Sequence, residues 1–279
     1  MNCENSLQEN SCEVKNLTSE EAAALEKQDS RLVSEFQAMK LEKEARKNWD
    51  LFYKRNETRF FKDRHWTTRE FEILADGLEE KVLFEVGCGV GNFFYPLLEE
   101  GKTLRVYACD FSSRAVEFVK KDARFDPEKI TAFQADITAD DLSANVPEGS
   151  VDVATLIFVL SAVHPEKFKQ ALGNILKVMK PGGLLLFRDY GLYDMAQLRF
   201  KPGHKIAENL YMRQDGTRSY YFSIEEVKRI FEEAGFSAKT VNYVHRRTIN
   251  KKDDVDVPRI FVQAEFIGKI IYKTHVQSR

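Results

Sequence analysis

The segment that most constrains the fold is the glycine-rich stretch at residues 84–92, which reads FEVGCGVGN. The apolar run before it, Lys81–Phe84, predicts a buried strand, and the residues after it, Asn92–Glu100, predict a helix. Three glycines at alternate positions allow a tight turn and a close approach of the backbone to a ligand. A strand, a glycine turn and a helix in this order form the nucleotide-binding unit of a doubly wound α/β sheet.

The spacing of the glycines narrows the choice of ligand. Dinucleotide-binding folds carry G-x-G-x-x-G, whereas this chain carries G-x-G-x-G, with Gly87 and Gly89 as its first two glycines and Glu85 just before them. A carboxylate at that place repels a pyrophosphate and suits a ligand with a cationic amine, such as S-adenosylmethionine. Because short glycine motifs also recur by chance, a turn without a ligand is the alternative.

Acidic residues also follow the next two predicted strands. Asp110 ends the strand expected at 104–109, and Asp136 follows the strand expected at 130–135. The carboxyl ends of parallel strands meet at one edge of a sheet, so Asp110 is placed to accept from ribose hydroxyls and Asp136 from an adenine amino group. An isolated Asp is more often a helix cap or a turn residue, and this alternative holds for each acid taken alone.

Further predicted strands complete the sheet. The strand Val151–Ile157 brings Ile157 and Phe158 to the same edge, where they can sandwich an adenine ring. The others lie at 184–187, 239–245 and 259–266. We therefore predict an α/β fold with a Rossmann-like, seven-stranded, mostly parallel sheet that ends in an antiparallel hairpin.

Composition bounds the class of protein. The chain has 279 residues and 43% hydrophobic content, enough for one large α/β domain with extensions. Its longest apolar stretch, Val153–Val163, is too short to span a membrane, and no signal peptide is visible. Four cysteines without C-x-x-C spacing predict a reduced compartment and no metal site. We expect a monomer in the cytoplasm that can also enter the nucleus.

The charge distribution favours a nucleic-acid partner, although the net charge of −2 does not. Lysine and arginine outnumber aspartate and glutamate by ten to six in Lys40–Glu70, by five to two in Arg199–Arg218 and by five to none in Lys239–Lys252. Such asymmetry can build a basic face on a weakly acidic protein. Scattered, solvated charge is the alternative unless these windows are adjacent in space.

The N-terminal region reads as an arm. Residues 1–17 are acidic and poor in apolar residues, which predicts disorder. Thr18 and Glu21 then match a capping box at the start of a long helical pattern. The apolar residues of that pattern share one side of the helix, and they are Leu25, Leu32, Phe36 and Met39.

A denser stretch follows at residues 48–66, where aromatic and basic residues alternate. Trp49 and Tyr53 lie one helical turn apart, so both rings can contact a common ligand or a common core. Core packing is the commoner fate of such rings. Aromatic rings mixed with lysine and arginine also suit base stacking and phosphate binding.

Several segments resemble a known family. The glycine turn, the acids after the strands, the Pro-Gly-Gly turn at 181–183 and the terminal hairpin resemble the class I S-adenosylmethionine-dependent methyltransferases over about residues 70–266. Four outer segments narrow this to the enzymes that form 3-methylcytidine in the tRNA anticodon loop, at position 32. These segments are KNWDLFYK at 47–54, FKDRHW at 61–66, FRDYG at 187–191 and RQDGTR at 213–218. The chain is most similar to the members that act on serine tRNA.

The resemblance implies a division of the chain and a set of site residues. The expected parts are a disordered N-terminus at 1–17, a helical arm that caps cofactor and RNA at 18–69, a methyltransferase domain at 70–268 with a substrate insertion at 191–222, and a tail at 269–279. The implied cofactor residues are Trp49, Tyr53, Glu85, Gly87, Gly89, Asp110, Phe111, Asp136, Ile137 and Ile157. The implied substrate residues are Arg64, His65, Arg188, Tyr190, Arg213 and Arg259.

Asp189 is the expected catalytic residue. N3 of cytosine carries a lone pair, so its methylation needs alignment and electrostatics more than a base. A carboxylate would stabilise the cation that forms, and we expect Asp189 to face the target base in this role. Implied partners are tRNA, most of all serine tRNA, and seryl-tRNA synthetase. The alternatives are a methyltransferase of the same fold acting on a small molecule or protein, and a scaffold without turnover.

Overall fold

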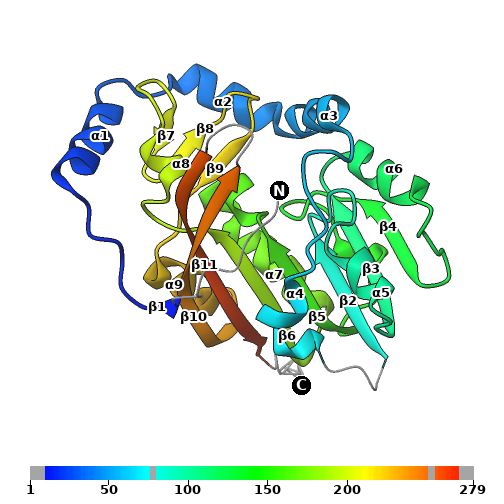
Figure 1. Ribbon diagram of the computed structural model, residues 1–279. Helices are drawn as coiled ribbons and strands as arrows, with labels where there is room; N and C mark the ends of the chain where they lie inside the picture. The colour runs from blue at the N-terminus through cyan, green and yellow to red at the C-terminus, as the bar shows by residue number, and fades with distance from the viewer. Residues whose placement is uncertain (1–9, 76–79, 251–254, 270–279) are drawn as a thin grey trace, which may run out of the picture.

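The computed structural model describes residues 10–75, 80–250 and 255–269, and an eight-stranded sheet forms its centre (Figure 1). The strand order is β1-β10-β11-β6-β5-β2-β3-β4. The strands are β1 Asn10–Ser11, β2 Lys81–Val86, β3 Leu104–Asp110, β4 Ile130–Gln134, β5 Val151–Ile157, β6 Met179–Tyr190, β10 Phe236–Asn250 and β11 Val255–Gly268.

The predicted seven-stranded arrangement is confirmed. Strands β4, β3, β2, β5 and β6 run parallel to one another, and β11 runs antiparallel to both β6 and β10. The short β1 adds an edge strand through Asn10 opposite Val244, at a place where we expected disorder. The chain leaves β2 toward β3 on one side and returns to β5 on the other, so a crevice forms at the end of β2. The glycine turn lies in this crevice.

Helices cover both faces of the sheet, and successive strand residues serve different cores. Phe84 packs in the core under α7 (Phe168–Val178) and α9 (Ile224–Glu233), whereas Leu83 packs under α5 (Phe94–Glu99) and α6 (Ser113–Lys121). The alternation follows from the two-residue repeat of a strand. Buried on both faces, the central strands hold their carboxyl ends in fixed positions.

The N-terminal arm consists of three helices, α1 (Ser19–Asp29), α2 (Glu35–Lys43) and α3 (Ala45–Asn56). The capping box at Thr18 is confirmed, since the Glu21 amide donates to its hydroxyl oxygen at 3.2 Å. The expectation of one long helix is wrong, because Ser34 caps a new helix by accepting from the Gln37 amide. The side chains of Leu32, Phe36 and Met39, expected on one side of that helix, are exposed.

The insertion at 191–222 is folded rather than a loop. It contains α8 (Met195–Leu198) and a three-stranded sheet made of β7 (Lys205–Ala207), β8 (Leu210–Met212) and β9 (Arg218–Tyr220). The arm lies against it, because the Val33 amide donates to the Lys205 carbonyl at 2.8 Å. Figure 1 shows the arm running past this small sheet to α6, so insertion and arm border the same edge of the main sheet.

The three basic windows are neighbours in space. The arm contacts the insertion, and Arg246 of β10 forms an ion pair with Glu70 at 2.6 Å. Helix α4 (Thr67–Glu70) therefore joins the basic window at Lys40–Glu70 to the one at Lys239–Lys252. Lys251 and Lys252, which contribute to the third window, lie outside the described residues, as do residues 1–9 and 270–279.

Candidate active site

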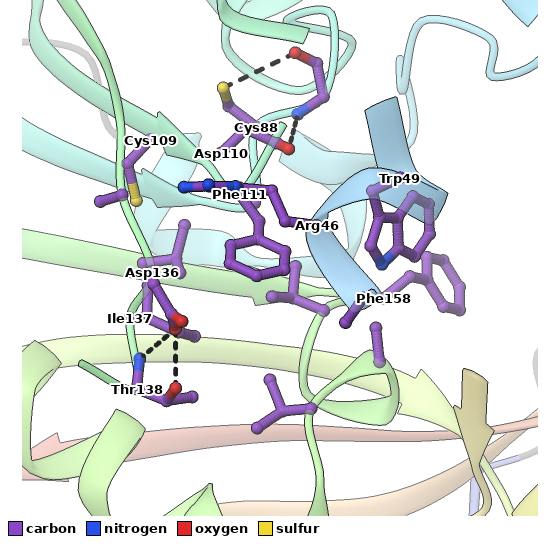
Figure 2. A pocket seen from close by; sticks show the side chains of 18 of the residues that line it. Arg46, Trp49, Cys88, Cys109, Asp110, Phe111, Asp136, Ile137, Thr138 and Phe158 are labelled. Atoms are coloured by element: carbon purple, nitrogen blue, oxygen red, sulfur yellow. Dashed lines mark hydrogen bonds between the residues drawn. The ribbon is translucent and has the colours of Figure 1, made fainter. Parts of the chain in front are cut away.

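A cavity of about 410 Å³ opens at the carboxyl ends of β2, β3, β4 and β5. It brings together every residue for which the sequence predicts a cofactor contact. These lining residues are Trp49, Tyr53, Glu85, Gly87, Gly89, Asp110, Phe111, Asp136, Ile137 and Ile157. Figure 2 shows Asp136 and Ile137 on one side of the cavity and Trp49 of α3 on the other.

The glycine turn forms the floor of this cavity and tolerates no side chain. Gly87 and Gly89 have φ angles of 65° and 56°, in the left-handed region that glycine favours. A Cβ at Gly87 would lie 2.4 Å from a methyl group of Val159, and one at Gly89 would lie 2.9 Å from the Tyr53 hydroxyl. The turn therefore needs glycine for its conformation and also for space.

Glu85 presents a buried carboxylate to the cavity. Its side chain is only 4% exposed, and among the described residues its Oε2 atom has no hydrogen-bond partner. Burial raises the pKa of Glu85 to about 8, although the nearby Arg64 guanidinium opposes the rise. An orphaned buried acceptor beside a glycine floor fits the amine of S-adenosylmethionine, which would supply the missing donor.

The other two acids, Asp110 and Asp136, also line the cavity, and each accepts hydrogen bonds from nearby residues, as expected of an Asp at a helix cap or a turn. Asp110 accepts from the amides of Gly89 and Ser112, both at 2.9 Å, and burial raises its pKa to about 6. Asp136 accepts from the amide and hydroxyl of Thr138 at 2.8 and 2.7 Å (Figure 2). A carboxylate oxygen has a second lone pair, so both acids keep acceptor capacity toward a ligand.

The arm closes the cavity through α3. Tyr53 is buried with its hydroxyl over Gly89, and the centroid of its ring lies 6.3 Å from that of Trp49. The same rings pack against Phe52, so core packing and cavity lining are combined in one helix. Asp50 of α3 accepts a hydrogen bond from the Ser112 hydroxyl at the start of α6, which fixes the helix on the main domain.

An arginine and an aromatic ring form the wall beyond Glu85. Arg64 lines the cavity, and its guanidinium carbon lies 5.6 Å from the centroid of the Phe158 ring. Burial lowers the pKa of Arg64, while the charges of Glu85, Tyr53, Tyr190 and Asp189 raise it. Phe158 has a φ of 61°, and a bulky residue in that conformation often marks a functional site.

Three of the expected substrate residues cluster beside this wall. The Tyr190 ring lies 5.3 Å from that of Phe158, and the Arg259 guanidinium lies 5.9 Å from the Tyr190 ring. Burial works to lower the pKa of Arg213, but the nearby Tyr190 and Asp215 raise it above its ordinary value. The structure thus places Tyr190, Arg213 and Arg259 together, next to the Arg64 end of the cavity.

Like Tyr190, Arg213 and Arg259, three further expected site residues do not line the cavity. We expected Asp189 to face the target base, but it is fully buried and accepts from the amides of Ser161 and Tyr190, both at 2.9 Å. Arg188 points to the other face of β6, where it pairs with Glu70 under the Trp66 ring. His65 is exposed at the surface.

Burial decides what Asp189 and Arg188 do in this structure. The bonds of Asp189 hold the turn at Leu160–Ala162, which follows the cavity wall, and burial raises its pKa to about 6. Arg188 fixes α4, three residues beyond Arg64. Both therefore shape elements that border the cavity without lining it.

The cavity is also lined by residues to which the sequence analysis assigned no site role. They are Glu42, Lys43 and Arg46 from the arm, Val159, His164 and Lys167 from the segment after β5, and Arg218 from the insertion. Arg46 reaches from α3 across the cavity toward Phe111 (Figure 2). Its place three residues before Trp49 was the available signal, since both lie on one face of the helix.

Comparisons with known proteins agree with this site. The family described as a methyltransferase domain matches residues 25–241. Human tRNA N(3)-cytidine methyltransferase METTL6 is 54% identical over 266 residues, which are 94% of this chain and 93% of that protein. The chain belongs to this methyltransferase family. The tRNA(Thr) (cytosine(32)-N(3))-methyltransferase of Saccharomyces cerevisiae is 42% identical over 84% of this chain and 38% of its own length.

A solved structure bears out the fold. It contains a putative methyltransferase in complex with the Haloferax volcanii Trm112 activator, and it superposes with a TM-score of 0.58 at 17% identity. The match covers 82% of this chain and 99% of that one.

Within residues 10–75, 80–250 and 255–269, no helix is long and apolar enough to cross a membrane, and no group of three or more His, Cys, Asp or Glu residues could hold a metal ion.

Proposed function

We propose that this protein transfers a methyl group from S-adenosylmethionine to N3 of cytidine 32 in the anticodon loop of tRNA. The observation that carries the proposal is the cationic and aromatic cluster next to the Arg64 end of the cofactor cavity. This cluster consists of Arg64, Phe158, Tyr190, Arg213 and Arg259. Rings and guanidinium groups at a cofactor site suit an unpaired base with its flanking phosphates.

The cavity residues account for cofactor binding. S-adenosylmethionine, when bound, supplies an electrophilic methyl group on a sulfonium centre. Glu85 offers its free Oε2 to the cationic amine, and Asp110 offers its remaining lone pairs to the ribose hydroxyls. Ile137, Ile157 and Asp136 line the cavity together, and the two isoleucines offer apolar surface on which an adenine ring can pack. Trp49 and Tyr53 exclude water from the opposite side.

The substrate chemistry needs positioning more than proton transfer. N3 lies on the Watson–Crick edge, so the cytosine must be unpaired and turned out of its stack. Tyr190 and Phe158 offer ring faces for stacking, and Arg213 and Arg259 offer charge to phosphates. Methylation leaves a cationic base, which the negative charge of Asp189 stabilises electrostatically.

The buried position of Asp189 gives it a second role. Its carboxylate accepts from the amides of Ser161 and Tyr190, and so it joins the turn after β5 to the end of β6. This bond holds Phe158 and Tyr190 close together. We therefore propose that Asp189 acts as a positioning residue and contributes its charge through the protein rather than by contact with the base.

The experiment that tests this function is methyl transfer to total tRNA, followed by mass analysis of the nucleosides. We expect 3-methylcytidine, and tRNA in which cytidine 32 is replaced should accept no methyl group. Another methylated nucleoside would overturn the choice of substrate. Methylation of a small molecule or a protein, with tRNA inert, would favour the first alternative. Failure to bind S-adenosylmethionine would favour a scaffold.

Finer features complete the proposal. We propose serine tRNA as the main substrate, seryl-tRNA synthetase as a partner, and a monomer that works in the cytoplasm with a nuclear fraction. The yeast relative named for threonine tRNA makes threonine tRNA the competitor to test. Parallel assays with purified serine and threonine tRNAs, with and without seryl-tRNA synthetase, decide this point. Equal rates on both tRNAs would contradict the preference for serine tRNA.

A further inference from the structure

Glu42 joins three separate walls of the cofactor cavity. It lies near the end of α2, and its two carboxylate oxygens bind Lys167 in the segment after β5 and Arg218 at the start of β9. Arg218 also donates to the Ala162 carbonyl at 3.2 Å. Glu42, Lys167 and Arg218 all line the cavity. We call these three residues the clasp.

The clasp is a principal contact of an otherwise lightly packed helix. Leu41 is the one buried residue of α2, while Phe36 and Met39 are exposed. The hydrophobic effect therefore holds α2 in place only weakly. Arg218 is 7% exposed, so its charge depends on a partner inside the protein. Burial works to raise the pKa of Glu42, but Lys167 and Arg218 lower it below its ordinary value, so the carboxylate is ionised.

A second contact links the same elements closer to the substrate cluster. The Asn48 side chain of α3 donates to the Gly216 carbonyl at 2.9 Å. Gly216 belongs to the turn that carries Arg213, since its amide donates to the Arg213 carbonyl at 3.1 Å. The arm that places Trp49 and Tyr53 on the cavity is thus bonded to the insertion at both Arg218 and Gly216.

We propose that Glu42 is a positioning residue whose ion pairs with Lys167 and Arg218 couple closure of the arm over the cofactor to the placement of the insertion. With the clasp formed, Trp49 and Tyr53 close the cavity while the turn carrying Arg213 is held at its mouth. With the clasp broken, the cofactor dissociates faster, and the insertion is no longer held in a fixed position relative to the arm. The coupling part of this inference rests on the proposed tRNA substrate, whereas the cofactor part does not.

The test compares Glu42→Gln with a matched control, Glu44→Gln. Glu44 lies two residues further along and forms an exposed ion pair with Lys47 at 3.3 Å, away from the cavity. We expect Glu42→Gln to raise the Kd of S-adenosylhomocysteine about tenfold, mainly through faster dissociation, as for loss of a partly buried ion pair. Glu44→Gln should leave the Kd unchanged. A Kd for Glu42→Gln within twofold of wild type overturns the proposal.

A double-mutant cycle separates the clasp from direct contact of Glu42 with the cofactor. After Glu42→Gln, the further change Lys167→Met should weaken S-adenosylhomocysteine binding by less than twofold, because the two residues act as one unit. Independent losses that multiply would overturn the ion-pair mechanism. Hydrogen exchange should also quicken in α3 and β9 together, and an increase confined to α2 would overturn the link to the insertion.

The coupling is measured with tRNA that the wild type methylates. In the wild type, saturating tRNA should tighten S-adenosylhomocysteine binding by about fivefold or more, and in Glu42→Gln this factor should fall close to one. An unchanged factor in Glu42→Gln would overturn the coupling. If the wild type accepts no tRNA, the proposed function fails, while the cofactor measurements still decide on the clasp.

Discussion

The buried carboxylate of Glu85 predicts that cofactor affinity falls as the pH is lowered from 8. Burial raises the pKa of Glu85 to about 8, and the cationic amine of the cofactor binds the ionised form. The ionised fraction is about 50% at pH 8, about 9% at pH 7 and about 1% at pH 6. The ligand amine titrates near the same pH, so about 50% of it is charged at pH 8 and about 91% at pH 7. Because binding needs the ionised carboxylate and the charged amine together, the Kd should rise about threefold from pH 8 to pH 7 and about eightfold more by pH 6.

The assay is calorimetric titration with S-adenosylhomocysteine between pH 6 and pH 8. Binding should release a net of about 0.8 proton per ligand at pH 7, which buffers of different ionisation enthalpy reveal. The ligand amine itself loses its proton near pH 8, so affinity should not rise further above that pH. Asp110, with a pKa of about 6, adds a second dependence only at the acid end of the range.

Glu85→Gln is the matched variant for this prediction. It keeps the size of the side chain, and it should bind more weakly with a Kd that does not change between pH 6.5 and pH 8. A wild-type Kd that is equally flat, or binding without proton release, would refute the reasoning. Either result would mean that Glu85 is already ionised in the free protein or does not contact the amine.

The same pKa makes a linked statement about stability. In the unfolded chain Glu85 loses its proton near its ordinary pKa of 4.5, whereas the folded chain keeps it up to about pH 8. The folded state therefore binds more protons in this window, and stability falls by at most about 1.36 kcal/mol for each pH unit between these values. The melting temperature of the free protein should fall between pH 5 and pH 8, and the fall should be smaller in Glu85→Gln.

Three further predictions concern the turn, the buried acid and the substrate cluster. Gly89→Ala should weaken S-adenosylhomocysteine binding about tenfold or more, because the added Cβ meets the Tyr53 hydroxyl. The control Gly101→Ala, also at positive φ but with open space around it, should cost only about 1 kcal/mol of stability. Calorimetry measures the affinities and thermal melts the stabilities, and equal cofactor affinities of the two variants would contradict this prediction. Asp189→Asn should lower the free energy of unfolding by about 1–3 kcal/mol and reduce turnover with little change in cofactor Kd, because two buried amides lose a charged acceptor. Denaturant unfolding and initial rates measure these effects, and wild-type values for both would remove Asp189 from the mechanism. Arg213→Ala should raise the KM for tRNA, and it should reduce the slope of log Kd for tRNA against log salt concentration by about 0.7, as for one lost phosphate contact. Filter binding at several salt concentrations measures this slope, and an unchanged slope would place Arg213 away from the RNA.

The sheet and the cofactor cavity were predictable because their signals are local. Each parallel strand is an apolar run, and Glu85, Asp110 and Asp136 lie within or directly after such runs. Parallel strands align their carboxyl ends, so residues far apart in sequence reach one edge without further information. The glycine turn is equally local, since positive φ angles at Gly87 and Gly89 require the residue type itself.

The roles of Arg188 and Asp189 were not predictable from their neighbourhood in the chain. Successive residues of β6 point to opposite faces, and the partner on each face comes from a distant segment. Arg188 meets Glu70, and Asp189 meets the Ser161 amide. Similarly, no sequence pattern announces that Phe158 adopts a φ of 61°, because this conformation depends on the surrounding packing.

The arm shows where local pattern and tertiary structure disagree. The helical repeat placed Leu32, Phe36 and Met39 on one side of a single helix, yet the chain forms two helices there and these side chains are exposed. Helix α2 is held instead by polar contacts, such as the ion pairs of Glu42 with Lys167 after β5 and with Arg218 of the insertion. An isolated ion pair between distant segments leaves no periodic trace in a sequence, so it appears only in the folded chain.

The sequence by itself determined the parallel sheet, the glycine turn and the acidic edge that we propose as the cofactor site, because each depends on residue type and on spacing within a single element. The tertiary structure decided what surrounds that edge. It brought α3 over Gly89, grouped Tyr190, Arg213 and Arg259 beside Arg64, and buried Asp189. These arrangements arise from packing between elements distant in the chain, where burial and pairing of charged groups fix which side chains reach the cavity.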